Sequence, residues 1–194
     1  MLTTETDRLI LRPPIEADRT RFVELFTTAA FTVFAGTHDV SSANARFDAM
    51  LTLASRVPYA KQPIIEKSSG RIVGYTGVGQ VVFDDLDRLE WGWRLVSEAR
   101  GRGYATEATT ALLNVAGAHD DGELLCIIAV DNQPSRRVAD KLGFRWWKHH
   151  IWPDDRTTTT DLLTRAVGAG GAPLLVPRSY EPPTVPVTRP QVTD

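Results

Sequence analysis

The stretch from residue 88 to residue 129 constrains the fold of this chain more than any other part of it. A half-polar strand pattern, RLEWGWRLV, is followed by a glycine-rich loop, a helix pattern that ends at about Ala118, and the apolar run ELLCIIAV. A short run without polar side chains is typical of a strand that is buried on both faces. Strands joined through a helix lie parallel in one sheet, with a right-handed crossover between them. The stretch therefore predicts an α/β sheet with a parallel pair of strands.

The patterns on either side extend this unit into a mixed α/β domain. Alternating apolar residues predict a strand over residues 7–13, and helical spacing predicts two helices, the second with Ser41 or Ser42 as its N-cap. QPIIEK and IVGYTGVGQVVF form a predicted hairpin, an acidic loop DDLD follows, and a later short helix runs from about Pro134 to a C-cap at Gly143. RWWKHHIW and TTTTDLLTRAV complete the sheet as another hairpin. In total, the sequence predicts about seven strands and about four helices.

We expect this domain to span residues 1–167. Residues 168–194 are rich in glycine and proline and show no helix or strand period, which is typical of a flexible or extended tail. Apolar residues in the tail leave a second interpretation open, in which part of it docks on the domain or on a partner subunit. These residues are Leu174, Leu175, Val176 and Tyr180.

The composition is that of an ordinary globular protein and excludes several classes of function. The 194 residues are 42% hydrophobic and 24% charged, and the net charge of -2 argues against a general nucleic-acid binder. Cys126 is the single cysteine and the four histidines are scattered, so no disulfide or metal site is expected. No segment has the ~20 apolar residues of a membrane span, and no signal-peptide pattern is present. We expect a cytoplasmic monomer or homodimer that binds no membrane and no specific nucleic acid.

The loop Arg100-Gly101-Arg102-Gly103 opens directly into a helix pattern and predicts a binding site for an anion. Glycine permits positive φ and leaves room for a ligand against the backbone. The first N–H groups of a helix lack partners within it and, with the helix dipole, attract phosphate oxygens. The two arginines add charge that can bind the same oxygens. The pattern suits a pyrophosphate, and an ordinary loop with glycine at a helix start is the alternative; neither the Walker nor the Rossmann signature is present.

These residues resemble a known family. Arg100 to Ala105 fit the Arg/Gln-x-x-Gly-x-Gly/Ala motif of the GCN5-related N-acetyltransferases (GNAT), and Thr106-Glu107-Ala108 continue it. TDRLILRP and LEWGWRLV are similar to the first and fourth strands of the branch that acetylates the amino termini of ribosomal proteins. Asn132, Ser135 and VADKLGF resemble the region after that branch's fifth strand. The resemblance covers residues 3 to 167 approximately and implies a GNAT fold, with a sheet that splays between its fourth and fifth strands.

The resemblance implies acetyl-CoA as the co-substrate, bound where those two strands diverge. Backbone groups of Leu95 and Val96 are then expected to pair with the pantetheine arm, and the N–H groups of residues 101–106 to bind the pyrophosphate. Asn132 is expected to reach the pantetheine amide, and Arg136 or Arg137 to approach the adenosine end. The expected acetyl-CoA contacts are Leu95, Val96, Arg100, Gly101, Arg102, Gly103, Tyr104, Ala105, Thr106, Asn132 and Arg136.

Acetyl transfer to an amine also needs a base, an oxyanion donor and a proton for the departing thiolate. Glu90 is the candidate base because it lies on the strand expected to line the acceptor side; a solvated or hairpin-paired glutamate is the alternative. Ser135 is the candidate proton donor by resemblance, and a helix N-cap is the alternative. An N–H near Val96 is the expected oxyanion donor, and Cys126 is expected to fill the core.

The acceptor is the least constrained part of the prediction. The resemblance implies a primary amine, either a protein N-terminus or a small cationic amine. Asp84, Asp85 and Asp87 adjoin the acceptor-side strand; an acidic rim there would favour a cationic acceptor, and a solvated loop is the alternative. A non-catalytic acyl-CoA-binding module on the same fold is the second function that the sequence allows.

Overall fold

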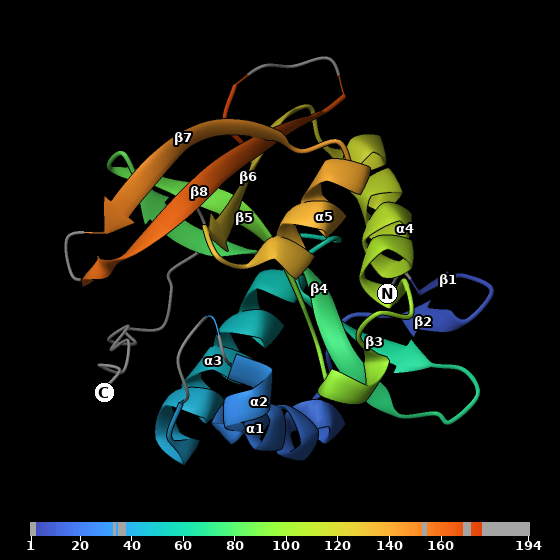
Figure 1. The fold of residues 1–194 in the computed structure, drawn as a ribbon. Helices are drawn as coiled ribbons and strands as arrows, with labels where there is room; N and C mark the ends of the chain where they lie inside the picture. Colours follow the sequence, from blue (N-terminus) through green and yellow to red (C-terminus); the bar gives the residue numbers. More distant parts are fainter. Residues whose placement is uncertain (1–2, 33, 35–37, 153–154, 169–171, 176–194) are drawn as a thin grey trace.

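A mixed sheet with helices on both faces organises the protein (Figure 1). The computed structural model describes residues 3–32, 34, 38–152, 155–168 and 172–175, with the backbone alone given for 155–158. Eight strands form one sheet in the order β1-β2-β3-β4-β5-β6-β8-β7. The α/β fold class expected from the sequence is confirmed, and the strand beyond the expected seven is β1 at the edge of the sheet.

The element bounds follow the expected order closely. The strands are β1 Thr4–Glu5, β2 Leu9–Leu11, β3 Gln62–Glu66, β4 Ile72–Phe83, β5 Leu86–Leu95, β6 Gly122–Ala129, β7 Arg145–Trp152 and β8 Asp155–Val167. The helices are α1 Arg19–Thr27, α2 Ala29–Thr32, α3 Val40–Ala54, α4 Tyr104–His119 and α5 Gln133–Lys141, with 3-10 turns η1 Glu16–Asp18 and η2 Ser97–Ala99.

The strands β4 and β5 form the long antiparallel hairpin at the centre of the sheet, with register pairs from Gly74↔Leu95 to Phe83↔Leu86. Asp84 and Asp85 make its turn, with φ values of 52° and 56°. Aspartate tolerates this left-handed region better than most residues and suits a two-residue hairpin turn. The loop expected at DDLD is therefore shorter than predicted, because its last two residues already belong to β5.

The parallel strands β5 and β6 are in register at one position, Glu90↔Leu125. On the amino-terminal side of this pair, residues 172–175 lie between the two strands: Leu89 N–H donates to Leu174 O at 2.8 Å, and Leu174 N–H donates to Glu123 O at 2.9 Å. On the carboxyl-terminal side the described residues of β5 and β6 form no further register pair. The two strands are thus joined by the tail at one end and diverge at the other, as the sequence predicted.

Residues 172–175 decide between the two interpretations of this part of the tail. The side chain of Leu174 packs against the main core, so the docking interpretation holds for residues 172–175. The domain boundary at Val167 stays a prediction, and the expected apolar residues Val176 and Tyr180 lie outside the described residues.

Two helix boundaries differ from the expected ones. Asp39, rather than Ser41 or Ser42, caps α3, and its carboxylate accepts the Ser42 N–H at 2.7 Å. The first expected helix is interrupted at Thr28, which is extended at φ −90° and ψ 118°. The Thr28 hydroxyl donates back to Glu24 O at 2.7 Å, and such back-bonding competes with helical hydrogen bonds.

The core lies on both faces of the central strands. Leu112 and Ala116 of α4 pack against Trp91 on one face, while Phe22 and Phe47 pack against Tyr75 on the other. Cys126 is buried as expected, and burial together with the charge of Glu90 raises the pKa of its thiol. No helix in the described part of the chain is long and apolar enough to cross a bilayer.

Candidate active site

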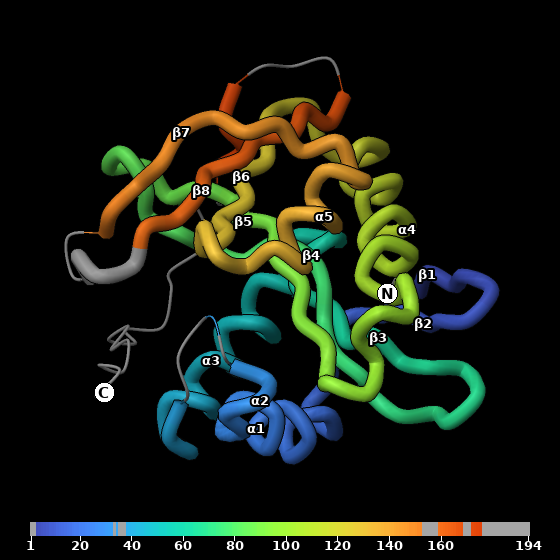
Figure 2. Tube along the Cα trace, in the orientation of Figure 1, coloured from blue at the N-terminus to red at the C-terminus, as the bar shows by residue number. Residues whose placement is uncertain are grey.

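The loop between η2 and α4 has the backbone of an anion site. Gly101 and Gly103 have φ values of 72° and 82°, a region that L-residues with a Cβ rarely adopt. A Cβ added at Gly101 would meet nothing within 4 Å, and one at Gly103 only Arg8 Nη2 at 3.5 Å. The space in front of these glycines is therefore open, and the tube in Figure 2 shows the loop entering the base of α4 beside β2 and β3.

The N–H groups of this loop have no acceptor among the described residues. The first bond of α4 runs from Glu107 N–H to Gly103 O at 3.0 Å, and no described backbone or side-chain group accepts from the N–H groups of residues 101–106. These N–H groups lie at the positive end of a helix of 16 residues. Backbone donors without partners at a helix N-terminus suit a pyrophosphate.

Neighbouring side chains hold the loop in place. Arg8 forms an ion pair with Glu107 and donates to Arg102 O at 3.0 Å. Glu66 accepts from Tyr104 Oη at 2.7 Å and pairs with Arg102 Nη1 at 2.8 Å. Hydrogen bonds from Tyr104 and Ser69, with the charge and hydrogen bond of Arg102, lower the pKa of Glu66 to about 2. The sequence did not reveal these braces, because their partners come from β2 and β3.

The two loop arginines have different surroundings. Arg100 is turned toward the protein, where its Nε donates to Leu95 O at 3.1 Å and its Nη2 to Ala30 O at 2.6 Å. Arg102 is paired with Glu66 but keeps half of its side chain exposed. Of the two, Arg102 is therefore placed to meet a ligand at the loop, and Arg100 is placed to fix the path of the backbone.

The carboxyl-terminal half of β5 directs alternate N–H groups toward the diverging edge. Val96 N–H donates to Val73 O of β4 at 2.9 Å, whereas Leu89 N–H points away from β4, to Leu174. Since N–H directions alternate along a strand, Trp93 and Leu95 also point away from β4. The oxyanion donor is expected near Val96: the Val96 N–H itself is already bonded, whereas the N–H groups of Trp93 and Leu95 face the edge.

The segment after β6 places the other expected contacts. Asn132 is the N-cap of α5, and its Oδ1 accepts the Ser135 N–H at 3.2 Å, so the cap is Asn132 and not Ser135. The side chain of Ser135 is half-buried. Arg136 pairs with Asp161 at 2.7 Å and with Asp140 at 3.3 Å, whereas Arg137 is exposed.

Glu90 lies on the face of β5 opposite α4 and is largely buried, with 17% of its side chain exposed. Lys61 Nζ lies 3.8 Å from its Oε2. The alternative of a hairpin-paired glutamate does not describe this position, because its cross-strand neighbour is Gly79.

The sequence did not reveal a cluster of cations next to Glu90. Arg94 shares a face with Glu90, and its guanidinium lies 5.8 Å from the ring centre of Tyr75. Burial would raise the pKa of the Tyr75 phenol, but the charges of Arg94, Arg46 and Lys61 outweigh it and lower the pKa to about 8. Alternation in the strand pattern could have placed Glu90 and Arg94 on the same face. Arg46, Lys61 and Tyr75 come from distant parts of the chain, so their position next to Glu90 was not predictable.

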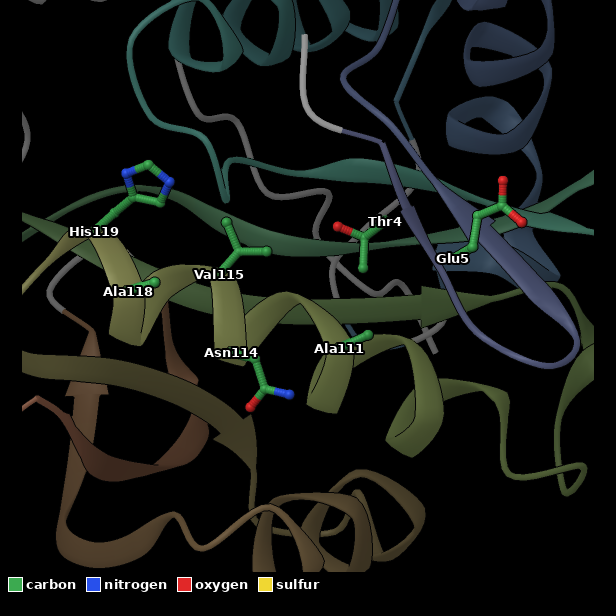
Figure 3. Close-up of a pocket in the computed structure, with 7 residues that line it drawn as sticks. All are labelled: Thr4, Glu5, Ala111, Asn114, Val115, Ala118 and His119. Atoms are coloured by element: carbon green, nitrogen blue, oxygen red, sulfur yellow. The ribbon is translucent and has the colours of Figure 1, made fainter.

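One hollow of the described chain lies apart from these groups, and another adjoins the glycine loop. The first, of about 420 Å³, lies between β1 and the carboxyl-terminal half of α4 (Figure 3), and Glu5 and His119 lie at its opposite ends. The second, of about 370 Å³, lies beneath the loop, lined by residues of α1, β4 and η2 and by both Glu66 and Arg102. No group of three or more possible metal ligands occurs among the described residues. The glycine loop and the diverging strands remain the candidate site.

Comparison with known proteins identifies this arrangement. A family model described as an acetyltransferase (GNAT) domain matches residues 8–145. The chain belongs to the GNAT family. The family and its structural neighbours make the chain an N-acetyltransferase, as the sequence resemblance implied. No match is found among curated proteins.

Solved structures agree with the GNAT fold. A GnaT-family acetyltransferase from Bordetella pertussis is 25% identical with a TM-score of 0.76, over 86% of this chain and 100% of the other. An acetyltransferase from Agrobacterium tumefaciens is 24% identical with a TM-score of 0.71, over 85% and 94%. RimL, a ribosomal L7/L12 α-N-protein acetyltransferase solved with coenzyme A, is 15% identical with a TM-score of 0.70, over 87% and 99%.

Proposed function

We propose that this GNAT enzyme uses acetyl-CoA and transfers the acetyl group directly to a primary amine. The observation that carries the proposal is the loop at residues 101–106, with two glycines at positive φ and N–H groups without described acceptors at the start of α4. A pyrophosphate linker fits such a loop, and the RimL structure contains coenzyme A on the same fold.

The diverging edge supplies the remaining contacts that the co-substrate needs. Trp93 and Leu95 offer N–H groups to the pantetheine arm or to the oxyanion that forms on the thioester carbonyl. Asn132 and Ser135 begin α5 directly after β6, the other strand of the cleft. Arg136 has two carboxylate partners, so the exposed Arg137 is the better candidate for the adenosine end.

The transfer requires three proton and bond changes. Glu90, directly or through water, takes a proton from the ammonium group, which is the main form of an alkyl amine at pH 7. The amine nitrogen then attacks the acetyl carbonyl carbon, a C–N bond forms and the C–S bond breaks. Ser135 is the proposed donor of a hydrogen bond or proton to the departing thiolate, and the second proton that the amine nitrogen loses restores the Ser135 hydroxyl or protonates the thiolate.

Binding and turnover together test this function. Acetyl-CoA should raise the melting temperature of the protein, whereas NADH and ATP should not, because neither carries the pantetheine arm. Release of free CoA thiol in the presence of an amine panel should then report transfer. Equal melting shifts with all three nucleotides, or none with acetyl-CoA, would contradict the proposal.

A further inference from the structure

An open area of sheet lies next to Glu90 on the face that α1 and α3 cover. Gly92 stands opposite Gly77, and Gly79 stands opposite Glu90. A Cβ added at Gly92 would have the Glu90 carboxylate as its nearest neighbour, at 3.4 Å, and Gly92 is partly exposed. Over Gly79 lies Lys61, whose Nζ would be 2.7 Å from an added Cβ. The area above Gly92 therefore has no side chain of its own strand position, is partly exposed, and has the carboxylate of the candidate base as its nearest group.

Positive charge surrounds this area and exceeds the negative charge beside it. Arg94 is two residues from Gly92 on the same strand face, and its guanidinium lies 5.6 Å from the ring centre of Phe31. Arg46 of α3 lies 5.2 Å from the ring centre of Phe26 and hydrogen-bonds to Tyr75. Within the described chain neither arginine forms an ion pair with a carboxylate, and Glu90 is paired with Lys61.

Arg94 also has an unused donor. Its Nη1 atom is buried and has no hydrogen-bond partner among the described residues. Burial lowers the pKa of this guanidinium, which reflects the cost of holding its charge away from water. An unpaired buried donor on a charged group is strongly unfavourable, and a ligand anion would remove that cost.

We propose that the acceptor amine carries a carboxylate, which Arg94 binds with Arg46 and Lys61 nearby, while the amine lies over Gly92 beside Glu90. The inference rests on the proposed function and adds the chemical class of its acceptor. A guanidinium with a free buried N–H binds a carboxylate through charge-assisted hydrogen bonds, and a neutral amide in that place would leave the charge uncompensated.

This class differs from the cationic acceptor that the acidic run favours in the sequence. Asp84 lies in the turn at the far end of the hairpin, 3.7 Å from Lys148 Nζ, and Asp87 accepts from Gln80 at 2.7 Å. Both carboxylates are thus separated from Gly92 by several residues of β5. Apart from Glu90, the charges that surround the open area are the cations Arg94, Arg46 and Lys61, which favour an acceptor with an anionic group.

Matched acceptor pairs test the proposal on the wild-type enzyme. Free amino acids, ω-amino acids and dipeptides are compared with their carboxamides, which keep the amine and lose only the carboxylate; amines with a phosphate are a third arm. We expect kcat/KM at least about 10-fold higher for the carboxylate of the best pair, as one charged hydrogen bond provides. Carboxamides that react equally well or better, or a preference for the phosphate arm, would overturn the proposal.

Variants assign the effect to the cluster. In Arg94→Gln the advantage of the carboxylate should fall below about threefold through KM, with acetyl-CoA affinity unchanged. Arg46→Gln, on a different element, should reduce it in the same direction, and the exposed Arg56→Gln, which removes the same charge elsewhere, should not. Unchanged discrimination in a folded Arg94→Gln would overturn the proposal. Absence of acetyl-CoA binding in the wild type would instead contradict the proposed function.

Discussion

The two faces of strand β5 differ in the chemical character of their side chains. The face toward α4 is apolar, and its central residue Trp91 is completely buried. The face toward α1 and α3 carries Glu90 and Arg94, with Gly92 between them. One strand thus supplies the core with one set of alternate residues and the proposed chemistry with the other. Substitutions on the two faces should therefore affect different quantities.

The largest effect is expected from Trp91→Ala. The indole stacks on Tyr59, with ring centres 6.1 Å apart, and donates to Thr76 Oγ1 at 3.2 Å. Loss of a fully buried tryptophan should lower the free energy of unfolding by about 3–5 kcal/mol in urea titrations. Trp147→Ala, at a side chain that is 40% exposed, should cost less than half as much. Equal losses would contradict the assignment of Trp91 to the core.

On the opposite face, Glu90→Gln should affect catalysis more than stability. We expect kcat to fall roughly 10²-fold or more, with the acetyl-CoA affinity unchanged. The largely exposed Glu24→Gln serves as the charge-matched control. If kcat and its pH profile stay as in the wild type, the base is water or the amine itself.

A smaller effect, on stability alone, is expected from removal of the tail segment that docks at the amino-terminal end of β5. A chain ending at Val167 lacks Leu174, which packs in the main core and bonds to both β5 and β6. Compared with a chain ending at Leu175, it should fold but be less stable to urea by about 1.5–3 kcal/mol. Identical unfolding curves would mean that the docked segment contributes nothing to stability.

The smallest effect concerns the pH dependence of the loop braces. The pKa of Glu66 is lowered from 4.5 to about 2, so its stabilising contribution is complete above pH 4.5 and is lost as the pH falls toward 2. Glu66→Gln should remove this part of the pH dependence. Urea midpoints of both proteins at pH 7, 4 and 3 measure it. A difference between the two proteins that widens as the pH falls would contradict the assignment.

Features that depend on neighbours in the chain were predictable from the sequence. The glycines before a helix predicted the loop with positive φ that opens into α4, and the half-polar pattern RLEWGWRLV predicted the strand β5. Features that depend on register were not predictable. The Val96 N–H donates to Val73 O because of the register between β4 and β5. Lys61 lies beside Glu90 because the chain crosses β4 at Gly77.

Calorimetric titration of acetyl-CoA into Gly103→Val, with Gly70→Val as the control, tests the central claim most directly. Both glycines have positive φ, 82° and 68°, so both variants carry a similar backbone strain. Only Gly103 lies in the loop, where the added side chain would fill the space of the pyrophosphate. We predict that Gly103→Val loses at least about 10-fold in acetyl-CoA affinity, as loss of charged hydrogen bonds implies, while Gly70→Val binds as the wild type does. Wild-type affinity in a folded Gly103→Val would contradict the account.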